Sequence, residues 1–117
     1  MRLLVQVATG PENPTRAALG LLAARTAAEE GHEVCVFLAG DGVQLARPET
    51  AAATQGIGSG SVAEHWEALA QSRIPVFLSG LSSTARGIDA ETRNGVELAQ
   101  PTKLVELAAW ADTALVY

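Results

Sequence analysis

Short apolar runs alternate with segments whose apolar residues recur at helical spacing along most of the chain. Residues 3–8, 33–39, 74–78, 96–99 and 113–117 are runs of strand length that end in turn-forming residues. Continuous apolar runs of this length are typical of strands covered on both faces, as in a parallel sheet. Their alternation with helical segments predicts an α/β fold built from right-handed crossovers, in a single domain over residues 1–117.

The helical segments carry recognisable start and stop signals. Asn13 before Pro14 predicts a helix start, and Gly31 predicts its end near Glu30. The capping-box sequence 61–64 predicts a second helix that runs to residue 71, and Pro101 predicts the start of the last helix. Residues 82–86 are expected to form a short helical turn, and residues 43–46 another.

Residues 49–60 have no clear period and end in a glycine-rich stretch. We expect a mobile loop there, and its segment Gln55–Gly60 is a candidate lid.

The last helix is apolar on more faces than one contact with a sheet requires. Its large apolar side chains include Leu104, Leu107 and Trp110. The surplus predicts a subunit interface on this helix and therefore a homo-oligomer.

Composition narrows the class of protein. The chain is 48% hydrophobic with a formal charge of −5, and its 8 basic residues are scattered, so nucleic acid is not an expected partner. A single cysteine excludes a disulfide framework and, with no signal-peptide pattern at the amino terminus, indicates a cytoplasmic protein. No stretch is long enough to span a membrane.

Ligands of open parallel sheets gather beyond the carboxyl ends of the strands. The residues that this rule brings to one crevice are Thr9, Asn13, Asp41, Ser79, Gly80, Ser82, Ser83 and Arg86. Arg86 is the charged residue most suited to bind an anion there, although an arginine at a helix end also commonly forms a surface salt bridge.

Four segments together resemble the DsrE/DsrF family, including its YchN-like branch. They are the loop after the first strand (9–14), Val36–Val43, Ser79–Ile88 and Gly95–Leu107. The resemblance implies a three-layer α/β/α sandwich on a five-stranded parallel sheet and a symmetric homo-oligomer. For sulfur-relay members it also implies a persulfide on a cysteine at the end of the third strand, and it points to a sulfur-relay protein as a possible partner.

Ser79 occupies the position of that cysteine. A persulfide relay needs a thiolate, which serine does not provide. Cys35 lies within the second strand, where a cysteine usually behaves as a small buried hydrophobe, so we expect it to be inert.

Other chemistry has little support in the sequence. His32 and His65 are not expected near Ser79, so no catalytic residue is assigned. Two distant histidines make no metal site, and no cofactor motif is present. We expect His32 to interact with the end of the first helix and His65 to lie at the edge of the second helix's apolar stripe.

These observations favour a non-catalytic module that binds a small anionic ligand or a partner in the crevice. One alternative is a sulfur carrier that uses Cys35 or a partner's thiol. A second alternative is a purely structural assembly subunit.

Overall fold

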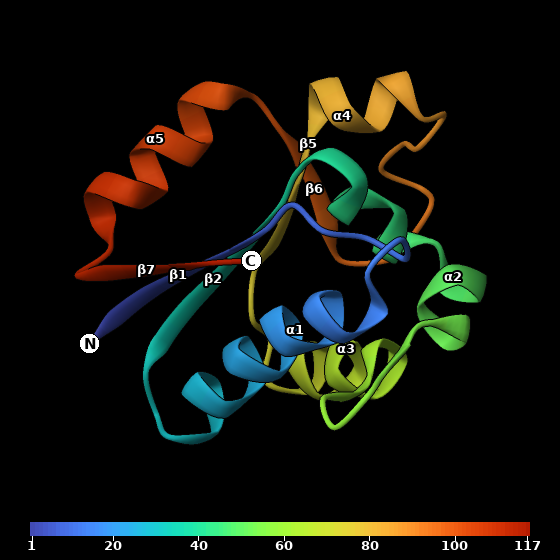
Figure 1. The fold of residues 1–117 in the computed structure, drawn as a ribbon. Helices are drawn as coiled ribbons and strands as arrows, with labels where there is room; N and C mark the ends of the chain where they lie inside the picture. The colour runs from blue at the N-terminus through green and yellow to red at the C-terminus, as the bar shows by residue number, and fades with distance from the viewer.

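The computed structural model describes all 117 residues as one chain of alternating strands and helices (Figure 1). The elements are β1 (Arg2–Val7), α1 (Pro14–Glu29), β2 (Glu33–Leu38), the 3-10 helix η1 (Gly40–Ala46), α2 (Pro48–Ala53), β3 (Gln55–Gly56), β4 (Gly60–Ser61), α3 (Val62–Gln71), β5 (Val76–Ser79), α4 (Gly80–Ala85), β6 (Val96–Ala99), α5 (Pro101–Trp110) and β7 (Thr113–Val116).

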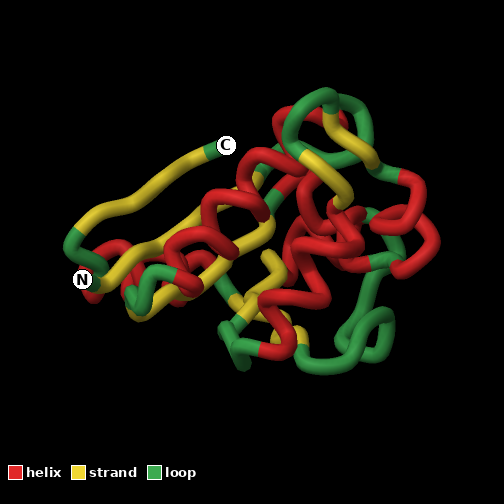
Figure 2. Tube along the Cα trace, turned by 90° about the horizontal axis from the view of Figure 1, so that it is seen from below, coloured by secondary structure: helices red, strands yellow, loops and turns green.

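Five strands form one sheet in the order β6-β5-β2-β1-β7, and every pair is parallel. The predicted five-stranded parallel sheet is therefore confirmed. In the register, Leu38 of β2 pairs with Leu78 of β5, and Ser79 pairs with Ala99 of β6, so the carboxyl ends of these strands meet at one edge. Figure 2 shows β7 along the outside of the sheet, where it pairs only with β1.

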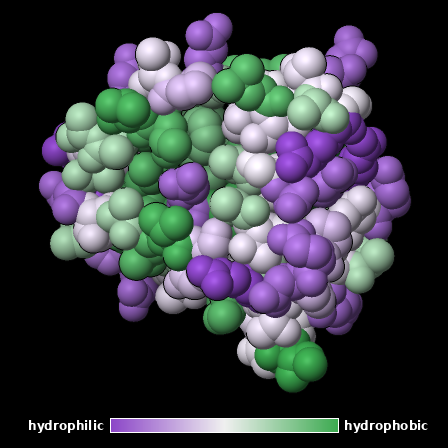
Figure 3. Space-filling model, turned by 45° about the horizontal axis from the view of Figure 1, so that its top comes forward, coloured by the Kyte–Doolittle hydropathy of each residue, from purple (hydrophilic) through white to green (hydrophobic).

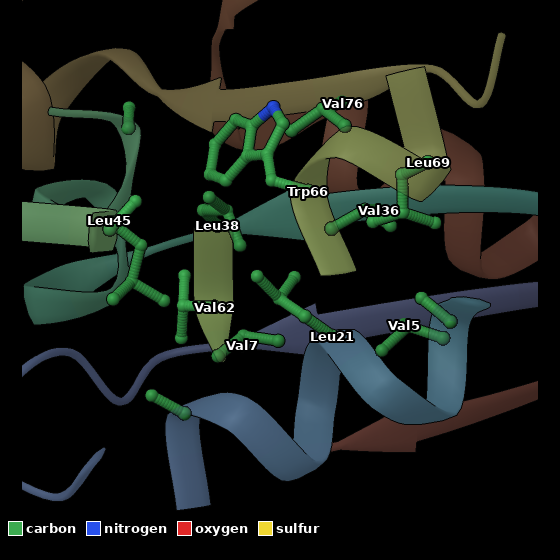
Figure 4. Packing of buried hydrophobic residues seen from close by; sticks show 14 of the residues in the cluster. Val5, Val7, Leu21, Val36, Leu38, Leu45, Val62, Trp66, Leu69 and Val76 are labelled. Carbon is green, nitrogen blue, oxygen red and sulfur yellow. The ribbon is translucent and has the colours of Figure 1, made fainter. Parts of the chain in front are cut away.

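Helices cover both faces of the sheet, as the sandwich requires. Alternate strand residues such as Val5, Val36 and Leu38 pack with α1 and α3 in a large buried cluster, part of which Figure 4 shows. The opposite alternation, which includes Leu4, Phe37 and Phe77, forms a smaller cluster beneath α5. This two-sided burial explains why the strands have continuous apolar runs.

The predicted caps are present at the atomic level. The Arg16 N–H donates to Asn13 Oδ1 at 3.2 Å at the start of α1, and the Glu64 N–H donates to Ser61 Oγ at 3.4 Å at the start of α3. Gly31, with φ of 88°, takes the left-handed conformation that ends α1.

The segment 49–60, where a mobile loop was expected, contains regular secondary structure. Helix α2 occupies residues 48–53, and β3 and β4 form a small antiparallel hairpin. Thr15 of α1 holds this hairpin by two hydrogen bonds: its hydroxyl accepts the Ile57 N–H, and its carbonyl accepts the Ser59 hydroxyl. Contacts with residues far away in sequence, rather than a local pattern, stabilise this segment.

Helix α5 covers the face of the sheet that carries the smaller cluster. Leu107 is buried against the sheet, and Leu104 and Trp110 pack around the same cluster, so most of the apolar surface predicted for an interface covers the chain's own core. Val105 is 68% exposed on the outer face of the helix. Figure 3 shows hydrophobic side chains gathered over the half of this side that α5 covers.

No helix combines the length and the apolar character that crossing a membrane needs.

Candidate functional site

Ser79 ends β5 and begins α4. Its hydroxyl accepts the Ser82 N–H at 3.2 Å, which caps this short helix. Ser79 is half-buried, and neither histidine contacts it. His65 is hydrogen-bonded to the Ser59 carbonyl and contacts Arg25, and His32 contacts the Met1 nitrogen. A serine without a base to take its proton is not activated as a nucleophile.

The loop after β2 meets α4 at this edge of the sheet. The Gly40 N–H donates to Ser82 Oγ at 2.8 Å. Arg86, at the end of α4, donates from Nε and Nη2 to Asp41 Oδ1 at 3.2 and 3.1 Å, and from Nη1 to the Ser82 carbonyl at 3.0 Å. The structure therefore brings Asp41, Ser79, Ser82 and Arg86 together.

Arg86 uses all three of its guanidinium nitrogens within the chain. It is the salt-bridged arginine considered as the alternative to an anion site, and an anion would have to displace Asp41 to bind it.

Three other predicted crevice residues have different surroundings. Ser83 points into the interior, completely buried, and its Oγ has no hydrogen-bond partner. Thr9 precedes Gly10, which packs so closely on the Asp41 backbone that a Cβ there would clash with the Asp41 carbonyl oxygen, so the loop after β1 also reaches this edge of the sheet. Asn13 is occupied as the cap of α1. The neighbouring Pro11 and Pro14 line a different hollow of about 440 Å³ with residues of α2.

A hollow of about 510 Å³ lies where β5 and β6 end, and Gly80 is the predicted site residue in its wall. The other lining residues are Leu81, Thr84, Leu98, Ala99, Gln100 and Pro101. Apolar side chains and the Pro101 ring form much of the wall, and Thr84 and Gln100 add polar groups. Sequence reasoning did not name this part of the site.

These wall residues could have been expected from the two predicted strands. Because β5 and β6 pair in parallel, the residues that follow them reach the same edge of the sheet.

Cys35 lies on the α5 side of β2 and is half-buried rather than fully buried as expected. Burial raises the pKa of its thiol, the Lys103 ammonium lowers it in part, and Glu33 raises it further. Cys35 precedes Leu38, the partner of Leu78, by three residues in β2, which places it about 13 Å along the strand direction from the level of Ser79. It is therefore neither activated nor part of the crevice.

The two histidines lie at the end of α1 and on the buried side of α3, and each also has a polar partner. His32 lies 3.2 Å through Nδ1 from the Met1 nitrogen, and only its backbone N–H bonds to the end of α1, at Ala27. His65 is buried and holds the Ser59 carbonyl with Nε2 at 2.7 Å. No group of three or more metal-ligating side chains occurs in the structure.

The comparisons with known proteins agree on one relationship. The sequence matches the DsrE/DsrF-like family over residues 1–117. The fold is similar to the crystal structure of the YchN protein from E. coli, with a TM-score of 0.78, 24% sequence identity and complete coverage of both chains. No curated protein matches the sequence significantly. The chain is therefore a member of the DsrE/DsrF-like family.

Proposed function

We propose that this chain is a non-catalytic, cytoplasmic member of its family, related to the sulfur-relay proteins, that works as a homo-oligomer and binds a small ligand or a partner segment beside Ser79. The observation that carries the proposal is the hollow at the ends of β5 and β6, next to Ser79. The family resemblance implies that sulfur-carrying members have a cysteine at this position. A serine there is consistent with a site that binds without carrying sulfur.

The chemistry of the hollow indicates the kind of ligand. Leu81, Leu98 and Pro101 offer an apolar wall, while Thr84 and Gln100 can form hydrogen bonds. Arg86 is engaged with Asp41, so a negative group is not the main requirement. An amphipathic ligand or an apolar side chain of a partner suits these walls better than a bare anion.

The binding test uses the dye 1-anilinonaphthalene-8-sulfonate as the probe. Leu81 is 71% exposed, so Leu81→Asp changes the wall of the hollow without disturbing the core. Saturable dye fluorescence should fall sharply in Leu81→Asp and stay unchanged in Ile57→Asp, a control that is 91% exposed on the hairpin. Equal fluorescence in all three proteins would remove the hollow from the proposal.

The alternative of a sulfur carrier needs a separate test. A carrier thiolate attacks the terminal sulfur of a donor persulfide, a new S–S bond forms, and the donor leaves as a thiolate. We would treat the natural protein, Ser79→Cys and Cys35→Ala with a cysteine desulfurase and cysteine, and measure intact masses. We expect a gain of one sulfur only in Ser79→Cys, at the helix start where a thiolate is favoured. A gain on Cys35 would establish the carrier function instead.

A further inference from the structure

A second cavity lies at the amino-terminal ends of β5 and β6, opposite the edge that carries Ser79. Its volume is about 230 Å³. Its walls are Trp66 and Ala70 of α3, residues 73–76 leading into β5, and residues 94–95 before β6. Figure 4 shows the Trp66 indole beside Val76, both of which also belong to the large core cluster. The base of the cavity is therefore apolar.

Arg73, in the wall of this cavity, has a strained backbone. It is the only non-glycine residue with positive φ, at 55°. Its N–H bonds the Ala70 carbonyl and the next N–H, of Ile74, bonds the Leu69 carbonyl, which together end α3. Glycine is the residue favoured at such a helix end. An arginine therefore stands in the cavity wall at a helix end where glycine is the favoured residue.

Arg93 adds a second guanidinium group beside the same tryptophan. Its Cζ lies 4.3 Å from the centroid of the Trp66 ring, and its Nη1 is sealed from solvent with no hydrogen-bond partner. Burial lowers the pKa of Arg93, and the nearby Glu67 opposes that effect. The positive charge of Arg93 therefore lies against Trp66, and no acceptor is bonded to its Nη1.

Two guanidinium groups near this cavity have no carboxylate partner. The protein carries a formal charge of −5, yet neither Arg73 nor Arg93 forms a salt bridge. Arg16 and Arg47 also lack a salt bridge, whereas Arg2, Arg25, Arg86 and Lys103 are each paired with a carboxylate. Planar guanidinium groups match the oxygens of carboxylates and phosphates, so Arg73 in the cavity wall and Arg93 over the Trp66 ring together favour an oxyanion.

We propose that this cavity binds a small organic oxyanion, whose acid group pairs with Arg73 in the field of Arg93 and whose apolar part contacts Trp66 and Pro75. The site lies at the opposite edge of the sheet from the hollow beside Ser79, so it stands or falls separately from the function proposed there.

Trp66 provides the readout for the test. The chain has two tryptophans, so Trp110→Phe leaves Trp66 as the only one. In this background we would titrate benzoate, the uncharged benzamide of similar shape, and inorganic phosphate while recording fluorescence. We expect a saturable change with benzoate and none with benzamide. If phosphate binds as well as benzoate, the acid group alone determines binding. If only benzoate binds, the ligand is an organic carboxylate whose apolar part also contributes.

Three variants connect the signal to Arg73. Arg73→Gln removes the charge but keeps a non-glycine residue at the strained position, and benzoate affinity should fall by about tenfold. Arg73→Gly should lose affinity equally while its melting temperature rises, because the strain is relieved. Arg16→Gln, on an exposed arginine of α1 without a salt bridge, should bind like the parent protein.

The proposal is overturned if neither anion gives a saturable change or if benzamide matches benzoate. It is also overturned if the Arg73 variants bind as the parent does, or if Arg16→Gln weakens binding as much as they do.

Discussion

Two adjacent serines on α4 have opposite environments. Ser83 is completely buried with an unpartnered hydroxyl, whereas the Ser82 hydroxyl accepts the Gly40 N–H at 2.8 Å. Burying a hydroxyl without a partner costs free energy, and removing one partner of an existing bond does too. The same substitution should therefore have opposite effects at the two positions.

We expect Ser83→Ala to raise the free energy of unfolding by about 1 kcal/mol and Ser82→Ala to lower it by about 1 kcal/mol. Urea denaturation of both variants measures the two values under the same conditions. A loss of stability in Ser83→Ala would mean that the Ser83 hydroxyl has a partner in solution.

The raised pKa of Cys35 leads to a pH dependence of reactivity and of stability. Burial is its main cause, with Lys103 lowering the pKa and Glu33 raising it. We expect iodoacetamide to modify Cys35 more slowly at neutral pH in the folded protein than in urea, because less thiolate is present. Glu33→Gln should speed the folded-state reaction, and Lys103→Gln should slow it.

The raised pKa of Cys35 also makes the stability of the fold depend on pH. A thiol whose pKa is higher in the folded state than in the unfolded state favours folding while it is protonated. This contribution is fully present below the ordinary value of 9.0 and is lost as the pH rises through the folded-state pKa. Cys35→Ala should lack this alkaline loss, and an unchanged profile in that variant would assign it to other groups.

Most helices and strands were predictable, because local sequence patterns encode them. The strands, the caps of α1 and α3, and the end of α1 at Gly31 all follow from short-range signals, and the structure contains them. The hairpin of β3 and β4 was missed because each strand has two residues and is held by Thr15, more than forty positions away.

The candidate site divides in the same way. Strand ends correctly placed Ser79 and Ser82 at one edge, and the structure adds the Arg86 pairing with Asp41, 45 positions earlier in the chain. No local sequence pattern predicts such a pairing. The wall that Leu98 and Pro101 contribute to the hollow is likewise not predicted by a local pattern.

The hairpin itself offers a matched pair of substitutions. Gly60 and Gly58 both have positive φ, at 83° and 77°. A Cβ on Gly60 would lie 2.9 Å from Nε2 of His65, whereas nothing lies within 4 Å of one on Gly58. The hydrogen bond from His65 to Ser59 fixes that ring in place.

We expect Gly58→Ala to lower the free energy of unfolding by about 1 kcal/mol through its backbone conformation alone. Gly60→Ala should cost at least about 1 kcal/mol more, because the buried ring must move. Thermal unfolding of the two variants gives the difference. Equal losses would show that the hairpin does not depend on His65.

The predicted oligomer can be tested by a substitution on α5. Trp110 is a poor choice for it, because its ring packs on the smaller core cluster and lies 5.8 Å from the guanidinium carbon of Arg2. A charge at that position would disturb the fold as well as any interface. Val105, which is 68% exposed, tests the outer face alone.

If copies of the chain associate through α5, Val105→Asp places a charge in the apolar centre of the interface and desolvates it without a partner. We expect the natural protein to sediment as an oligomer and Val105→Asp to sediment as a monomer with an unchanged circular dichroism spectrum. Ile57→Asp removes a similar exposed side chain from the hairpin and should leave the oligomer intact. An oligomer that survives Val105→Asp, or one that only Ile57→Asp breaks, would exclude the outer face of α5 as the interface.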